Sequence, residues 1–240
     1  MSVERPRVAM MIVDTLPPER AAVAGDYPEL YRAMFAVHDL DLVMFDAHLG
    51  VLPDSLDGFD AVFIGGSKFS SIDDDQWILD LIELVVDAYE RDVALLGVCF
   101  GHQLIARALG GEVVQWDSWN VGAIDYEFED GTEYTLLAVH QDQVIVPPEG
   151  AEVIASAPGC DIAGYVLGDQ VVTIQPHPEF VPELAAVIYD GRREAIGSDL
   201  ADEALDTARS KEIHGAEFVA EMVGFLRDHV ASRAEAGAGS

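Results

Sequence analysis

Basic residues are scarce in this chain of 240 residues, which has 13 lysines and arginines against 44 aspartates and glutamates. Only Lys68 and Lys211 are lysines. The net charge of −31 repels nucleic-acid phosphates and anionic membranes, so neither partner is expected. The acidic residues recur between apolar segments, which argues against a disordered acidic chain. The pattern predicts a solvated acidic surface, and it is also typical of halophilic adaptation, in which salt screens the self-repulsion.

Long apolar runs and cysteines are scarce as well. No stretch of about 20 apolar residues is present, so we expect no helix that spans a membrane. The N-terminal segment MSVERPRVAMMIVDT lacks the layout of a signal peptide. Cys99 and Cys160 could pair, but free thiols are the expectation for a soluble intracellular protein. We therefore expect a cytoplasmic protein.

The apolar pattern predicts strands that alternate with helices. Strands are predicted at 7–14, 40–46, 59–64 and 93–98, and helices at 28–37, 76–90 and in FGHQLIARALGG. Further strands are predicted at 134–139, 152–156, 162–167 and 170–174, and helices at 182–196 and 199–230. This order favours an α/β fold with an open, mostly parallel sheet flanked by helices and a small antiparallel extension.

No linker interrupts the chain, which favours a single domain. We expect this domain to cover residues 1–232, with a helical C-terminal extension at about 182–230. The last residues, 233–240, are predicted to form a disordered tail.

Gly97-Val98-Cys99-Phe100-Gly101 lies where a buried strand turns directly into a helix. A tight turn of this kind projects its central side chain from the carboxyl edge of the sheet, and the glycines leave room for the neighbouring strand and helix. The N-terminus of the following helix favours a thiolate at Cys99. The sequence therefore predicts a cysteine nucleophile, with the Phe100 N–H as an oxyanion donor. Cys160 follows a predicted turn without such an elbow and is interpreted as structural.

His177 is the candidate base for this nucleophile. An apolar strand precedes it in VVTIQPHPEF, and Pro176 and Pro178 restrict its backbone. Glu179 lies two residues on and faces the same way in an extended segment, so its carboxylate can orient the imidazole. His102 is interpreted as structural or as a neighbour of the site, and His140 as a residue that lines the pocket. The remaining histidines are expected at the surface: His38, His48, His214 and His229.

Gly65 and Gly66 end the strand at 59–64. They could form an ordinary turn, or expose a backbone N–H toward the nucleophile as a second oxyanion donor. The segment lacks the residues of a phosphate-binding loop. No cysteine or histidine pair has the spacing of metal ligands, so we expect neither a metal nor another cofactor.

These segments resemble a known family. LLGVCFGHQLIARALGG is similar to the nucleophile segment of class I glutamine amidotransferases, and IQPHPEF is similar to their His-Pro-Glu segment. Ile64-Gly65-Gly66 resembles the family's oxyanion strand, and His140-Gln141-Asp142 resembles its H-x-D segment. The resemblance extends over about residues 7–180 and implies the flavodoxin-like fold of this family.

The resemblance also implies a chemistry. The triad would be Cys99, His177 and Glu179, and the glutamine side-chain amide would form a γ-glutamyl thioester that water hydrolyses. The oxyanion donors would be the backbone of Gly66 and Phe100. The substrate pocket would include Gly65, Gln103 and His140.

Two features are more similar to the free-standing branch of the family, which also resembles plant γ-glutamyl peptidases. Ser67 follows Gly-Gly where synthase-linked members usually have proline, and GRREAIG occurs at 191–197 in an extended helical region. The first hypothesis is therefore a hydrolase of glutamine or of a γ-glutamyl amide or peptide. The alternatives are a glutaminase subunit that delivers ammonia to a synthetase in trans, a non-catalytic binding or regulatory module, and a cysteine hydrolase of unrelated substrate.

Overall fold

The computed structural model describes residues 5–238, and its strands form one mixed sheet. Residues 1–4, with which the predicted domain begins, and residues 239–240 of the predicted tail lie outside the described part. The strand order is β2-β1-β3-β4-β9-β8-β7-β5-β6. This arrangement confirms the predicted α/β class, with a parallel core and an antiparallel extension.

The parallel part of the sheet consists of the strands that carry the most apolar segments. They are β1 (Arg7–Met11), β2 (Asp41–Phe45), β3 (Ala61–Ile64), β4 (Ala94–Val98) and β9 (Val171–Ile174). All of them lie within predicted strands. Continuous apolar runs are typical of strands buried on both faces, as in β3 and β4, whereas β2 is a half-buried edge strand. Strand β4 pairs with β9 in the register Val98↔Ile174, so the segments that follow these two strands emerge side by side.

The antiparallel part adds the two longest strands. It contains β5 (Glu112–Phe128), β6 (Glu133–Val146), β7 (Glu152–Ala157) and β8 (Cys160–Leu167). Strand β5 was not predicted, and β6 extends well beyond the predicted 134–139. The pairing of β5 with β6 is irregular between Gln115 and Asn120, where several side chains are exposed. That stretch carries no apolar alternation, so only its partner strand reveals it as β structure.

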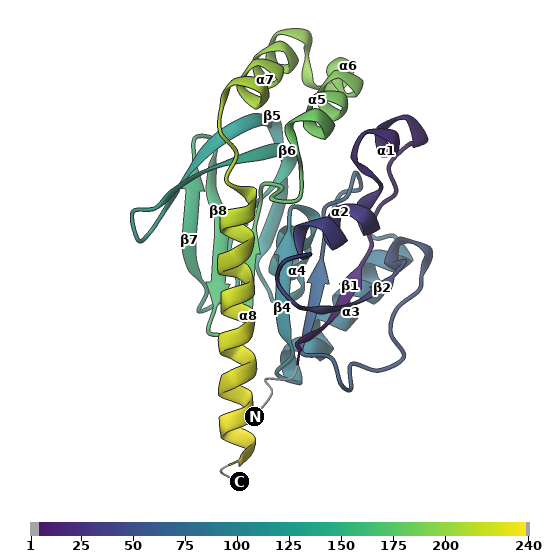
Figure 1. Ribbon diagram of the computed structural model, residues 1–240, viewed down its shortest axis with the longest axis vertical. Helices are drawn as coiled ribbons and strands as arrows, with labels where there is room; N and C mark the ends of the chain where they lie inside the picture. Colours follow the sequence, from purple (N-terminus) through teal and green to yellow (C-terminus); the bar gives the residue numbers. More distant parts are fainter. Residues whose placement is uncertain (1–4, 239–240) are drawn as a thin grey trace.

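Helices cover both faces of the sheet (Figure 1). Val8 and Met10 of β1 face a core that includes α2 (Tyr27–Met34) and α8 (Gly215–Ala238). Ala9 and Met11 face the opposite core, with α3 (Gln76–Glu90) and α4 (Phe100–Ala108). This alternation follows from the two-residue period of a strand. None of the helices in the described chain has the length and apolar character needed to cross a membrane.

The remaining helices lie near one end of the molecule, at the top of Figure 1, where α1 packs against α5. They are α1 (Pro18–Ala24), α5 (Pro182–Gly191), α6 (Arg193–Ile196) and α7 (Ser198–Ser210), and a short 3₁₀ turn, η1, spans Ala47–Leu49. Helix α1 was not predicted, because it has seven residues and none of them is buried. The predicted helix at 199–230 is divided into α7 and α8 by residues 211–214.

Helix α8 differs from the prediction at its C-terminal end. It continues through residues 233–238, where the sequence predicted a disordered tail. Alanine, glutamate and arginine dominate this stretch, and these residues have high helix propensity. Extending a helix that already exists requires no new nucleation, so this stretch can stay helical.

Candidate active site

Cys99 connects β4 to α4 with a strained backbone. Its φ of 50° and ψ of −102° lie in a region that residues with a side chain rarely adopt. The flanking glycines make the turn possible, because a Cβ on Gly97 would lie 2.8 Å from the Gly101 backbone. A Cβ on Gly101 would lie 2.1 Å from the Ile64 carbonyl oxygen. The elbow predicted from the sequence therefore has the geometry that its glycines require.

Phe100 is the first residue of α4, so its N–H has no partner within the helix. This N–H lies beside the nucleophile candidate and is available to an oxyanion. The Phe100 side chain is buried and stacks on Trp77, with ring centroids 5.6 Å apart. The stacking holds the first turn of α4 in place, and the helix N-terminus adds a partial positive charge near Cys99.

His177 and Glu179 form the hydrogen-bonded pair that the sequence suggested. The two partners are His177 Nδ1 and Glu179 Oε1, 2.8 Å apart, and both side chains are buried. The His177 N–H donates to the Leu137 carbonyl of β6 at 2.8 Å, which anchors the segment after β9. The imidazole stacks on Phe180 with ring centroids 4.1 Å apart. These contacts fix the ring orientation and leave Nε2 as the nitrogen that faces away from Glu179.

The Cys99 and His177 side chains meet beside Gly66. A Cβ on Gly66 would lie 2.5 Å from His177 Cε1 and 3.6 Å from Cys99 Cβ, so a side chain here would displace the imidazole. Burial alone lowers the pKa of His177, but the negative charges of Cys99 and Glu179 outweigh it and raise this pKa to about 10. The arrangement therefore favours an imidazolium next to the sulfur, the state in which a cysteine is nucleophilic.

Gly65 and Gly66 have more specific contacts than the sequence suggested. The Gly66 N–H donates to the Tyr31 hydroxyl of α2 at 3.1 Å. The Gly65 carbonyl accepts from the Gly101 N–H at 3.1 Å, and a Cβ on Gly65 would lie 1.8 Å from the Tyr31 oxygen. Gly65 thus joins β3 to α4, and it does not line either of the two pockets described below. Gly66 could serve an oxyanion only by exchanging the Tyr31 oxygen for that of a substrate.

A small pocket of about 90 Å³ lies at Cys99. Gln103 and His140, both predicted to line a substrate pocket, are in its wall. The Gln103 amide donates to the Asp142 carbonyl at 2.8 Å, and His140 Nδ1 lies 3.2 Å from the same carbonyl oxygen. Burial lowers the pKa of His140 to about 4, so this histidine is neutral near pH 7. The wall thus offers polar groups without a charged histidine.

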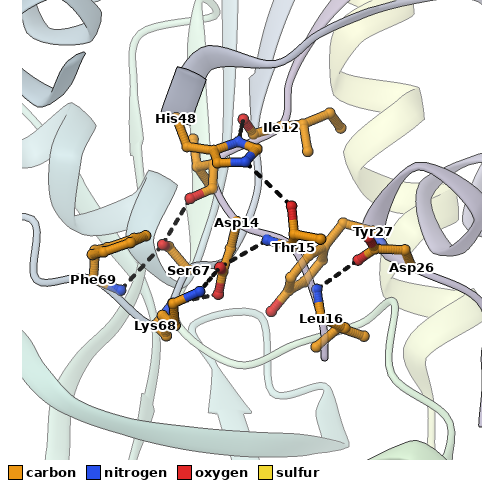
Figure 2. A network of polar contacts seen from close by, with 11 residues as sticks. Ile12, Asp14, Thr15, Leu16, Asp26, Tyr27, His48, Ser67, Lys68 and Phe69 are labelled. Atoms are coloured by element: carbon orange, nitrogen blue, oxygen red, sulfur yellow. Dashed lines mark hydrogen bonds and ion pairs between the residues drawn. The ribbon is translucent and has the colours of Figure 1, made fainter. Parts of the chain in front are cut away.

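A larger pocket of about 330 Å³ adjoins the first and is lined by His177. Its floor includes the buried carboxylate of Asp14, which accepts from the Lys68 ammonium at 2.6 Å and from the Lys68 N–H at 3.0 Å. The Thr15 N–H donates to the same carboxylate at 2.7 Å. Figure 2 shows how Asp14 connects the segments that follow β1 and β3. This network fixes the loops on one side of the candidate site.

Arg20, Arg192 and Trp119 also line the larger pocket, and none of them was predicted as a site residue from the sequence. The Arg192 guanidinium lies 5.8 Å from the centre of the Trp119 ring. The scarcity of basic residues could have pointed to the two arginines, because any arginine in so acidic a chain is a candidate for a specific role. No sequence signal pointed to Trp119.

The other residues considered in the sequence lie away from these pockets. Cys160 is a free, buried thiol, and burial raises its pKa to about 12. His102 is buried with its Nδ1 2.8 Å from the Thr173 hydroxyl. The surface prediction for His229 was wrong, because this face of α8 packs on the protein and leaves the residue 1% exposed. Within residues 5–238, no cluster of three or more His, Cys, Asp or Glu side chains is placed to hold a metal ion.

The chain is similar in sequence to known proteins. Residues 32–189 match the family described as Glutamine amidotransferase class-I. Gamma-glutamyl peptidase 3 of Arabidopsis thaliana is 27% identical over 207 residues, which cover 78% of this chain and 83% of the plant protein. A glutamine-hydrolysing GMP synthase subunit of Sulfolobus acidocaldarius is 32% identical over 157 residues, which cover 60% of this chain and 81% of the archaeal protein.

Solved structures give the same result for the fold. The crystal structure of a glutamine amidotransferase from Thermotoga maritima superposes with a TM-score of 0.72 at 16% sequence identity. The superposition covers 95% of this chain and 99% of that one.

Proposed function

Because this chain belongs to the class-I glutamine amidotransferase family, we propose that it hydrolyses the γ-amide bond of glutamine or of a γ-glutamyl amide through Cys99. The observation that carries this proposal is the strained Cys99 elbow beside the buried His177–Glu179 pair. A thiolate, an oriented imidazole and a free helix N–H are the groups that acyl transfer requires.

In the proposed reaction the Cys99 thiolate attacks the γ-carbonyl carbon. The oxygen of the tetrahedral intermediate accepts a hydrogen bond from the Phe100 N–H. It accepts a second one from the Gly66 N–H if that group gives up its hydrogen bond to the Tyr31 hydroxyl. The C–N bond then breaks, and the leaving nitrogen takes the proton of the His177 imidazolium. Water attacks the resulting thioester while His177 accepts its proton, and glutamate leaves as the thiolate–imidazolium pair is restored.

A matched pair of cysteine variants tests the proposal. Glutamate release is measured with L-glutamine and with γ-glutamylglycine for the native protein, Cys99→Ala and Cys160→Ala. Loss of the nucleophile removes covalent catalysis, so Cys99→Ala should lose at least about 10⁴-fold in kcat. Cys160→Ala should keep the native rate. Equal rates for native protein and Cys99→Ala would contradict the thiol mechanism, and native protein inactive on every γ-glutamyl compound would favour a non-catalytic module.

A second candidate function is glutamine hydrolysis that supplies ammonia to a separate synthetase. The similarity to the GMP synthase component of Sulfolobus acidocaldarius supports it, because that name describes one subunit of a glutamine-hydrolysing synthase. Under this alternative, glutamine would be the substrate and its hydrolysis by the isolated chain would be slow. Adding the partner synthetase with its nucleotide would raise the rate, whereas γ-glutamyl peptides would stay poor substrates.

A further inference from the structure

The larger pocket is lined by more basic than acidic side chains, which is unusual in a chain of net charge −31. Three of the 13 basic residues line it, namely Arg20, Lys68 and Arg192, whereas Asp14 is its one carboxylate. Asp14 is already bonded to the Lys68 ammonium. Arg20 and Arg192 have no ion pair with any acidic residue in the described part of the chain. Two uncompensated guanidinium groups thus face one pocket in a protein of net charge −31.

The packing of α1 against α5 places Arg20 beside Gly191, the residue that precedes Arg192. Gly191 ends α5 directly before Arg192, and a Cβ at Gly191 would lie 2.4 Å from a guanidinium nitrogen of Arg20. The missing side chain lets Arg20 lie against the end of α5. Arg192 in turn lies near the Trp119 ring, and both arginines are partly buried. Two positive charges that line one pocket repel each other, so an anion bound in that pocket would stabilise the arrangement.

The position of His177 indicates that this pocket holds the leaving amine of the substrate. In the proposed reaction His177 protonates the leaving nitrogen, so the amine must extend toward the histidine. His177 and Arg20 line only the larger pocket, whereas Cys99 lines only the smaller one. Arg192 lines both pockets and therefore lies where they adjoin. Ammonia from glutamine would leave a space of about 330 Å³ unfilled, but an amino acid or a short peptide could occupy it.

We propose that Arg20 and Arg192 bind the carboxylate of an anionic leaving amine, so that the preferred substrates are γ-glutamyl amino acids or peptides with a free C-terminal carboxylate. This inference rests on the proposed function and specifies its substrate class. Guanidinium groups bind carboxylates through paired, charge-assisted hydrogen bonds. A local positive site also offsets the repulsion that the acidic surface exerts on an anionic substrate.

The test compares each acid with its amide. The substrates are γ-glutamylglycine and γ-glutamylalanylglycine, each with a free carboxylate or as the C-terminal amide. For the native protein we expect kcat/KM to be about 10- to 100-fold higher for the acid of at least one pair, the effect typical of a charge-assisted hydrogen bond. The double variant Arg20→Gln/Arg192→Gln should reduce this preference to near unity, and Arg192→Lys alone should keep part of it.

Arg209→Gln is the matched control. Arg209 is exposed, lines neither pocket and has no ion pair within residues 5–238, so its variant removes one positive charge, as each of the two substitutions does, without touching the site. It should keep both the native rate and the native acid preference. Native protein that cleaves acid and amide equally well would overturn the inference, and so would an acid preference that survives in the double variant.

Binding to Cys99→Ala separates this inference from the proposed reaction. Calorimetry with the uncleaved acid and amide needs no turnover, and the acid should bind about 10-fold more tightly or better. If the native protein cleaves none of these compounds, the proposed function fails, and the binding ratio still decides whether the arginines recognise a carboxylate. Equal affinities for acid and amide would overturn the inference.

Discussion

The two cysteines of this protein are both buried, but their surroundings differ, and we propose opposite chemistry for them. Cys99 lies at the carboxyl end of β4, before a helix N-terminus and beside the His177 imidazole. Cys160 begins β8 and follows a turn instead of preceding a helix, and burial raises its pKa to about 12. Burial alone therefore makes a thiol inert. A strained turn, a helix dipole and a cationic partner are what make one reactive.

The largest expected effect comes from removing the base that accompanies Cys99. His177→Asn keeps a similar shape but cannot hold or transfer the proton, so kcat for γ-glutamyl hydrolysis should fall by about 10²–10⁴-fold. Steady-state rates with L-glutamine or γ-glutamylglycine measure it. His102→Asn is the control, because His102 is buried near Thr173 and lines neither pocket. A His177→Asn enzyme with native activity would remove His177 from the mechanism.

The charge on His177 should depend on Cys99. The Cys99 and Glu179 charges raise the pKa of His177 to about 10, so the imidazolium persists at neutral pH and is lost as the pH rises through that value. In Cys99→Ala the contribution from the sulfur disappears while burial still opposes the charge. The imidazole signals in NMR should then titrate at a clearly lower pH, and the same midpoint in both proteins would contradict a thiolate–imidazolium pair.

A side chain at position 66 should separate Cys99 from His177, the proposed nucleophile and base. In Gly66→Ala the new Cβ would lie 2.5 Å from His177 Cε1, so the imidazole must shift, and a displacement of about 1 Å can cost about 100-fold in kcat.

Gly159→Ala is the matching change beside Cys160. Its φ is 76° and the nearest side-chain atom would be 3.5 Å away, so it should cost about 1–2 kcal/mol of stability without loss of activity. Denaturant unfolding and kinetics on both variants distinguish these outcomes. If Gly66→Ala were as active as Gly159→Ala, the His177 imidazole would tolerate the methyl group at position 66.

The smallest effect is expected at Cys160 itself. Cys160→Ala removes a buried sulfur that lies outside both pockets, so the free energy of unfolding should fall by only about 1 kcal/mol, or about 2–4 °C in Tm. Activity should stay within about 2-fold of the native value. A larger loss of activity would mean that Cys160 influences the site in a way that its contacts do not explain.

The parallel half of the molecule was easier to predict than the antiparallel half. Strands β1, β3 and β4 are continuous apolar runs, and α3 coincides with the predicted 76–90. Strand β5 has exposed polar residues near Trp116 and an irregular register, so its β structure depends on pairing with β6. Helix α1 has no buried residue, so its sequence lacks the apolar periodicity from which a helix is predicted.

The sequence by itself determined the features that depend on near neighbours along the chain. The glycines around Cys99, the apolar strand before it and the two-residue spacing of His177 and Glu179 are local, because backbone sterics and strand geometry act over a few residues. These patterns were sufficient to suggest the family and the candidate triad.

Only the tertiary structure decided which of these segments meet. The β4–β9 pairing brings His177 to Cys99, and the contact of α1 with α5 places Arg20 beside Gly191, in the pocket that Arg192 also lines. Tyr31 reaches the Gly66 N–H from α2 in the same way. Contacts between distant segments follow from strand order and helix packing across the whole core, and no short stretch of sequence encodes them.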